Sequence, residues 1–160
     1  MSTDLFLKID GITGESQDSN HRGWINIESF TWGASQPGSM SIGGGGGAGK
    51  VQYRDLSVLT HIDKATPAIM RYVSIGKHMN KVELSVCKAG GSQIEYCRIT
   101  LEDVLITNVV FNGTTNRDLI GLSYQFQASR VKTQYWEQSA GGGKGAETQS
   151  GWDIKGNKEV

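Results

Sequence analysis

The residues with the most recognisable chemical spacing form a glycine-rich run that ends in a lysine. Residues 44–50 fit the first part of the phosphate-loop pattern, in which glycine amides cradle phosphates and a lysine reaches them. The next position breaks the pattern, because Val51 stands where a serine or threonine would hold Mg²⁺. A strand-prone run follows it, whereas a phosphate loop should open a helix. A nucleotide hydrolase is therefore the weakest hypothesis, and it requires ATP binding that Lys50→Ala abolishes.

The histidines and acidic residues lack the spacing of a metal site or a catalytic site. His21, His61 and His78 show no HxxxH spacing and have no cysteine pair beside them. The pair Glu102 and Asp103 lies among β-prone residues and indicates a bulge or an exposed edge rather than a catalytic pair of carboxylates. We expect no catalytic residue, no metal and no cofactor.

Two cysteines lie in strand-like runs on either side of a predicted turn. Cys87 precedes the turn at residues 89–92, and Cys97 follows it. A tight turn would place Cys97 opposite Glu83 or Leu84, several residues along the ladder from Cys87. That separation exceeds the Cα distance of about 7 Å that a disulfide tolerates. We predict two free thiols in a reducing compartment.

Length and composition favour one mainly β domain that covers residues 1–160. Of the 160 residues, 22 are glycine and two are proline, which suits strands joined by glycine turns. Sixteen Lys and Arg balance sixteen Asp and Glu, so we expect no nucleic-acid partner. No window approaches the roughly 20 apolar residues of a membrane span, so we expect no membrane insertion. Asp4 and Lys8 disrupt any signal peptide, which predicts synthesis in the cytoplasm and another route for any export.

Alternating apolar residues predict six strand regions. They lie at residues 5–9, 24–32, 51–62, 81–88, 94–111 and 122–135, with a bulge in the third. In the last one Leu122, Tyr124 and Phe126 face inward, and the apolar positions change side further on, which predicts a bend or bulge near Arg130. The pattern favours a tight antiparallel β-barrel or sandwich with one short helix and a long glycine-rich loop.

One segment has helical signals instead. Residues 66–76 carry Thr66 as an expected N-cap, Pro67 in the first turn and Gly76 as an expected left-handed C-cap. Its apolar stripe, expected to pack on the sheet, consists of Ile69, Met70 and Val73.

The longest unusual stretch is an uncharged glycine-rich arm at residues 33–50. Eight of its first seventeen residues are glycine, and a loop of this length inside a compact domain is commonly functional or disordered. Because glycine lets backbone approach backbone, the arm can lie against a neighbouring subunit, although a surface loop without function is the alternative. A second cluster at 141–145 predicts a linker within residues 139–160, beyond which Trp152 and Ile154 dock on this subunit or on the next.

Several short motifs occur together in this chain. They are Trp32-Gly33, Ser35-Gln36, Gly43 to Lys50, Asp63 to Pro67, Gly76 to His78, Lys88 to Gly91, Ile99 to Leu101 and Gly151 to Lys155. In this order, along essentially the whole chain, they resemble the Hcp family, the tube-forming proteins of the bacterial type VI secretion system. The resemblance implies a tight β-barrel with a flanking helix, similar to phage tail-tube proteins.

The resemblance also implies an assembly. Six copies would close into a homohexameric ring, and rings would stack into a tube that a contractile sheath expels. The implied partners are further copies of the chain, the spike protein VgrG, the sheath and effector proteins. The protein would be cytoplasmic when made and then secreted to the exterior or into target cells.

Two groups of residues are candidates for contacts in such an assembly. Polarity on one strand face suggests an inner wall for effectors, made of Thr31, Ser123, Gln125 and Gln127. The expected subunit and stacking contacts are Ser39, Met40, Gly43, Gly44, Gly45, Gly46, Gly47, Trp152 and Ile154.

Two functional hypotheses from different classes follow. In the first, the chain is a structural tube subunit that carries effectors in its lumen. In the second, it is chiefly an effector-binding chaperone or receptor, and tube building is secondary. Under the first hypothesis, a charged residue introduced into the arm should prevent rings from stacking. Under the second, a larger side chain at Thr31 should make the rings lose their effectors.

Overall fold

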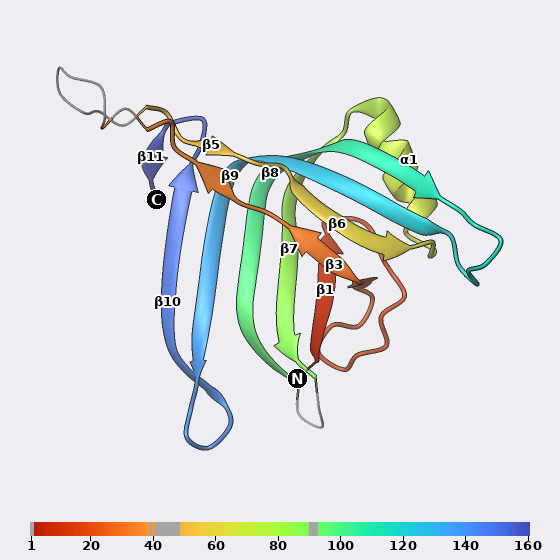
Figure 1. The fold of residues 1–160 in the computed structure, drawn as a ribbon, viewed down its shortest axis with the longest axis horizontal. Helices are drawn as coiled ribbons and strands as arrows, with labels where there is room; N and C mark the ends of the chain where they lie inside the picture. The colour runs from red at the N-terminus through yellow and green to blue at the C-terminus, as the bar shows by residue number, and fades with distance from the viewer. Residues whose placement is uncertain (1, 39, 41–48, 90–92) are drawn as a thin grey trace.

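Most of the chain forms antiparallel strands around one apolar core (Figure 1). The computed structural model describes residues 2–38, 40, 49–89 and 93–160. Within these residues there is one helix, α1 (Thr66–Ile75). The strands are β1 (Thr3–Ile9), β2 (Ile25–Ile27), β3 (Ser29–Thr31), β4 (Ala34–Ser35), β5 (Gln52–Tyr53), β6 (Leu56–His61), β7 (His78–Lys88), β8 (Ile94–Asn112), β9 (Gly121–Gln138), β10 (Lys144–Asp153) and β11 (Lys158–Glu159).

The pairing of the strands almost encircles the core. In the described part of the chain, nine strands form one antiparallel sheet along the path β11-β10-β9-β8-β7-β1-β2, while β6 pairs with β9 and β3 pairs with β6. Only Glu28 separates β2 from β3, and its N–H donates to the backbone oxygen of Leu59 on β6. The prediction of a mainly β barrel or sandwich is confirmed, and an incompletely closed sandwich is the better description because β2 has no ladder with β6 among these residues.

The two longest strands belong to both halves of this sheet. Residues 121–126 of β9 pair with β6, whereas residues 130–138 pair with β10. Figure 1 shows β8 and β9 curving between these two partners. The same two strands therefore contribute to both layers of the sandwich.

The predicted change of side along β9 is present, and of the two alternatives, a bend or a bulge near Arg130, the structure has the bend. Phe126 and Val131 are both buried, although their odd spacing would put them on opposite faces of a straight strand. No bulge lies near Arg130, because the register with β8 stays continuous through this region. Opposite Ser129, Asp103 on β8 has a φ of +53°, which is rare for a residue other than glycine. The ladder between β8 and β9 also shifts further along, between Ile106 and Asn108.

The predicted inward-facing residues form the core. The side chains that are at most 1 % exposed include Leu7, Ile9, Val82, Leu84, Tyr124 and Phe126. Burying one such side chain contributes about 1.5–3 kcal/mol, so these alternating positions hold the two layers together.

The helix is confirmed at its predicted place. Gly76 ends it in the left-handed conformation, with φ 64° and ψ 38°, and its N–H donates to the backbone oxygen of Tyr72. The helix packs on β8 through Ile69, which is fully buried. Met70 is 38 % exposed, so the apolar stripe is narrower than predicted. No helix in the described residues has the length and apolarity needed to cross a membrane.

The predicted role of Thr66 as the helix N-cap is wrong. Ala65 occupies that position, and no side chain caps the helix there. The Thr66 hydroxyl instead accepts a hydrogen bond from the Asp63 N–H and lies 3.1 Å from the Tyr124 hydroxyl. Burial raises the pKa of Tyr124, whose neutral hydroxyl needs a partner inside the core. Thr66 therefore joins the start of the helix to β9.

The predicted register of the two cysteines is also wrong. Lys88 pairs with Ile94 rather than with Ser92 or Gln93, and an irregularity between Val86 and Cys87 shifts the ladder by one more residue, so Cys97 lies opposite Val86. Both thiols are free and point to opposite faces: Cys87 contacts Ser85, and Cys97 lines an apolar groove. Alternation across the strand therefore keeps the two thiols apart, rather than distance along the ladder.

The second glycine cluster is a turn and not a linker. The backbone N–H of Ser139 donates to the oxygen of Gly143, and Gly142 has a φ of +86° that suits glycine. This turn joins β9 to β10, which pairs along β9 as far as Asp153. Of the two docking alternatives, the chain's own core accepts the apolar residues of this segment, since both Trp152 and Ile154 pack against it.

We expect Thr66→Val to lower the free energy of unfolding by about 1–3 kcal/mol, because it leaves the buried Tyr124 hydroxyl without its partner. Thr66→Ser keeps a hydroxyl, so its free energy of unfolding should fall clearly less. Urea denaturation at one fixed protein concentration measures both changes. Equal losses in the two variants would contradict this role for Thr66.

Candidate functional site

A row of polar side chains covers the outside of the sheet formed by β3, β6, β9 and the end of β8. Thr31 lies opposite Ser57, which lies opposite Gln125, so these three side chains form one line across the strands. Val58 and Tyr124, which neighbour them in sequence, point into the core. We call this surface the polar face; its polar residues are Ser29, Thr31, Ser57, Asn108, Ser123 and Gln125, and the exposed apolar residues Leu59 and Val110 lie among them, on either side of Ser123.

The structure brings three of the four predicted inner-wall residues together on this face. Thr31, Ser123 and Gln125 come from strands far apart in sequence, and the pairing of β3, β6 and β9 aligns them. Gln125 Nε2 donates to Ser57 Oγ at 3.0 Å. None of these residues is charged, so the surface offers neutral hydrogen-bonding groups with Leu59 and Val110 between them.

Gln127, the fourth predicted residue, lies further along β9 at the edge of a cleft. It pairs with Leu105 where β8 and β9 bend, and the cleft there has a volume of about 300 Å³. The residues that line it include the apolar Phe126 and Trp32 and the charged Arg54. Gln127 is thus continuous with the polar face but has a different neighbourhood.

Asp103 is the most perturbed charge at this cleft. The Ser129 hydroxyl donates to its carboxylate at 2.7 Å, and His78 Nδ1 lies 3.5 Å away. The Ser129 hydrogen bond first, and His78 second, hold the pKa of Asp103 below its ordinary value. Ser129 and His78 thus hold Asp103, the residue with a positive φ at the bend, and they fix the position of the bend.

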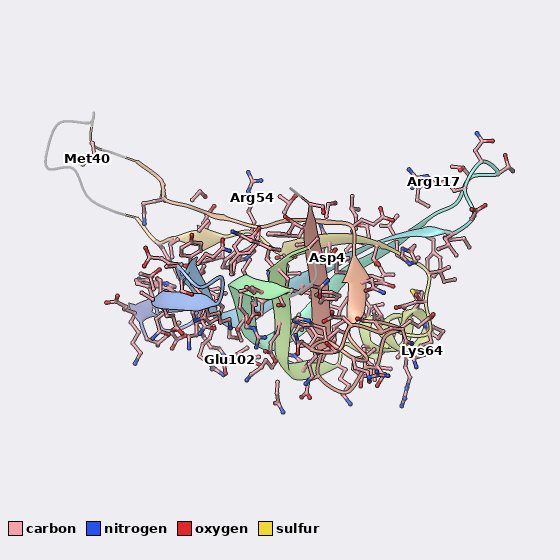
Figure 2. The ribbon with its side chains drawn as sticks, turned by 90° about the horizontal axis from the view of Figure 1, so that it is seen from below. Asp4, Met40, Arg54, Lys64, Glu102 and Arg117 are labelled. Carbon is pink, nitrogen blue, oxygen red and sulfur yellow. The ribbon has the colours of Figure 1, made fainter. Side chains whose placement is uncertain are left out.

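The structure separates the predicted stacking residues. Met40 is 83 % exposed, and Figure 2 shows it far from Arg117, at the opposite end of the molecule. β4 and β5 pair beneath it and form the base of the arm. Trp152 lines a cleft at this base together with Gln36 and Gly49, while Ile154 lies beside the cleft at the bend. Ser39, Gly43, Gly44, Gly45, Gly46 and Gly47 lie outside the described residues.

An exposed apolar cluster at the end of the β8–β9 hairpin was missed from the sequence. We call it the hairpin end; it consists of Phe111, Leu119 and Ile120, which are 40–50 % exposed. The Ile62 N–H donates to the backbone oxygen of Ile120 and ties this end to β6. Three successive apolar residues at 109–111 were the available signal, since strict alternation would have placed a polar residue among them.

A second unpredicted feature is a buried polar cluster around His21. A chain of hydrogen bonds runs from the Asp18 carboxylate through the His21 imidazole to the Ser85 hydroxyl. The same order of groups activates a serine in many hydrolases. Here Ser85 is fully buried, and its hydroxyl donates to Glu95 at 2.6 Å. The arrangement therefore suits a structural hydrogen-bond network better than a nucleophile. Among the described residues, no group of three or more His, Cys, Asp or Glu side chains is placed to hold a metal.

Known proteins are similar to this chain in both sequence and fold. The family described as "Type VI secretion system effector, Hcp" matches residues 6–137. Protein hcp1 of Pseudomonas aeruginosa is 42 % identical over 162 residues, which cover 100 % of both chains. A structure described as a type six secretion system protein has a TM-score of 0.93 at 26 % identity and covers 99 % of this chain and 100 % of that chain. Hcp1 from Salmonella typhimurium has a TM-score of 0.84 at 32 % identity and covers 100 % of each chain.

The family match over most of the chain, on an open β-sandwich, shows that this is a structural protein of a secretion system. The chain belongs to the Hcp family, the tube proteins of type VI secretion. The resemblance inferred from the sequence motifs is thereby confirmed.

Asp103→Asn should make the unfolding of the protein less sensitive to acid. A carboxyl whose pKa is lowered on folding stabilises the fold above its unfolded pKa of about 3.9, and this contribution is lost as pH falls through the folded pKa. Asparagine tolerates the positive φ, so the variant changes the charge and keeps the backbone. Unfolding midpoints between about pH 2.5 and 7 should separate from those of the parent above pH 5 and converge at the acid end. A constant separation at every pH would contradict this prediction.

Proposed function

We propose that the chain is the ring-forming subunit of the type VI secretion tube, that six copies close into a ring, and that stacked rings carry effectors in their lumen. The observation that carries this proposal is the polar face, an uncharged and mostly hydrogen-bonding surface that backs directly onto the core. An inner wall needs this combination, because charges or apolar patches would hold a passing protein too strongly. In this proposal Thr31, Ser123 and Gln125 face the lumen, with Gln127 at its margin.

The hairpin end is the proposed contact between neighbours in a ring. Phe111 and Leu119 are 47 % and 50 % exposed, and such a cluster on a small domain indicates a surface that a partner covers. It lies at one end of the molecule only, so the contact would be heterologous, and heterologous contacts close into rings when the rotation permits. We assign this contact to another copy of the chain.

The glycine-rich arm is the proposed contact between rings. Its base at β4 and β5 projects beyond the sandwich, with Met40 at its outer part (Figure 2). Ser39 and Gly43 to Gly47 belong to this proposal as sequence predictions alone. Trp152 supports the base of the arm through the cleft that it shares with Gln36 and Gly49.

Further partners and the location follow from the family role. We propose that the tube contacts the spike protein VgrG at its tip and a contractile sheath around it, and that no cofactor and no catalysis are involved. The subunit would be made in the cytoplasm without a signal peptide and expelled through the secretion system.

Phe111→Glu should convert rings into smaller species without unfolding the subunit. A carboxylate buried in the contact without a partner costs about 3–5 kcal/mol. Native mass spectrometry of the parent should give six copies, and that of the variant mainly one. Ile75→Glu is the matched control, because Ile75 is 61 % exposed at the end of α1 and is not part of the hairpin end. Rings of Phe111→Glu that persist, or rings that Ile75→Glu also breaks, would contradict the assignment of the contact.

Thr31→Gln should reduce effector retention by about tenfold or more, which corresponds to about 1.4 kcal/mol, while rings persist. The longer side chain would occupy the surface between β3 and β6 in every copy. Thr31→Ser keeps the hydroxyl and should retain effectors. Co-purification of effectors with rings measures both variants. Undiminished retention would remove Thr31 from the inner wall, and loss of rings would place Thr31 in a subunit contact instead.

A further inference from the structure

Two apolar side chains interrupt the polar face. Leu59 on β6 is 51 % exposed, and Val110 on β8 is 45 % exposed. Both lie opposite Ser123, because β9 pairs with β6 on one side and with β8 on the other. Residues directly opposite each other in neighbouring strands point to the same side of a sheet. An apolar residue therefore stands on each side of one serine in the same row.

The neighbouring row on the same strands has a different composition. It consists of Ser57, Gln125 and Asn108, which are all polar and lie two residues along from the apolar row. Gln125 Nε2 donates to Ser57 Oγ, so groups of this row bond to one another. Two residues of a strand span about 7 Å, so a molecule on this face can contact both rows at once. It would find hydrogen-bonding groups in one row and two apolar side chains in the other.

The two apolar residues do not belong to the core. Val58 and Tyr124, which precede Leu59 and follow Ser123 in sequence, are fully buried on the other side of the sheet. Leu59 and Val110 thus occupy outward positions, where the fold requires no apolar residue. Single exposed apolar residues are common on proteins, but two in register on an otherwise polar surface can contact the same partner.

The surroundings of this row restrict what can cover it. β6 has a paired strand on each side, β3 and β9, so a copy that adds at an edge of the sheet leaves Leu59 uncovered. No residue of the polar face carries a charge that could pair with a charged segment. Further along β6, His61 Nδ1 lies 3.6 Å from Glu28 Oε1, which engages that carboxylate within the chain. The face therefore matches an uncharged segment with both apolar and hydrogen-bonding side chains.

We propose that Leu59 and Val110 select the effectors that the tube carries, by contact with an uncharged segment of the effector that exposes apolar side chains. The inference rests on the proposed function, in which this face lines the lumen. A ring would repeat the row in every copy, so weak contacts from several copies add up on one effector. Two half-exposed side chains in each copy form a much smaller surface than a continuous apolar patch, so they discriminate between effectors without preventing release.

Two synthetic peptides test this selection on the purified full-length protein. Both have capped ends and no charged residue. One carries leucines separated by serine and glycine, and in the other serine replaces every leucine. The parent should bind the leucine peptide about tenfold more tightly than the serine peptide, because only the leucines bury the exposed parts of Leu59 and Val110. Fluorescence anisotropy of labelled peptides measures both affinities.

The double variant Leu59→Thr, Val110→Thr should bind the two peptides with equal affinity. Threonine suits a strand, so the fold and the rings should persist. Ile75→Thr is the matched control, because it removes an exposed apolar side chain at the end of α1, outside the polar face. This control should keep the tenfold preference.

Native mass spectrometry of the same samples separates this inference from the proposed function. A parent that forms no ring would remove both. Parent rings that bind the two peptides equally, or a double variant that keeps the preference, would overturn the inference alone. Loss of rings in the double variant would overturn it as well, because Leu59 and Val110 would then belong to a contact between copies.

Discussion

The bend shared by β8 and β9 is the constraint on which the remaining structure depends. Each strand must serve both layers of the sandwich, so the side of the strand that faces the core has to change along its length. Asp103 makes this change with a positive φ that Ser129 and His78 hold in place. Because of it, Phe126 and Val131 are both buried, and the polar residues of the first half of β9 remain on the outside.

Each surface that the fold presents follows from this geometry. The first half of β9 pairs with β6, and β6 pairs in turn with β3, which aligns uncharged, mostly polar side chains into one face outside a largely apolar layer. The same half carries β8 and β9 outward into a hairpin whose apolar end is not covered by the subunit itself. The second half pairs with β10, whose Trp152 returns to the base of the glycine-rich arm. The inner wall, the contact between neighbours in a ring and the contact between rings are thus three proposed consequences of one bent pair of strands.

Local patterns in the sequence identified what depends on local chemistry. Alternation identified the inward faces of β1, β7 and β9, and the left-handed glycine marked the end of α1. Features that depend on distant partners were missed. A bulge moved Cys97 opposite Val86, the hydroxyl of Thr66 was taken by Tyr124, and His21 meets Ser85 from 64 residues away. The 141–145 cluster looked like a linker because a hairpin turn and a linker have the same glycine-rich composition.

The central claim is that the polar face lines the inside of a closed ring of copies. Electron cryomicroscopy of the purified full-length protein tests it most directly, since it shows both the number of copies and the direction in which the strands face. The account predicts a six-membered ring with β3, β6 and the first half of β9 around the central opening, and Thr31 and Gln125 pointing into it. A solitary subunit, or a ring with these strands on its outer surface, would contradict the account.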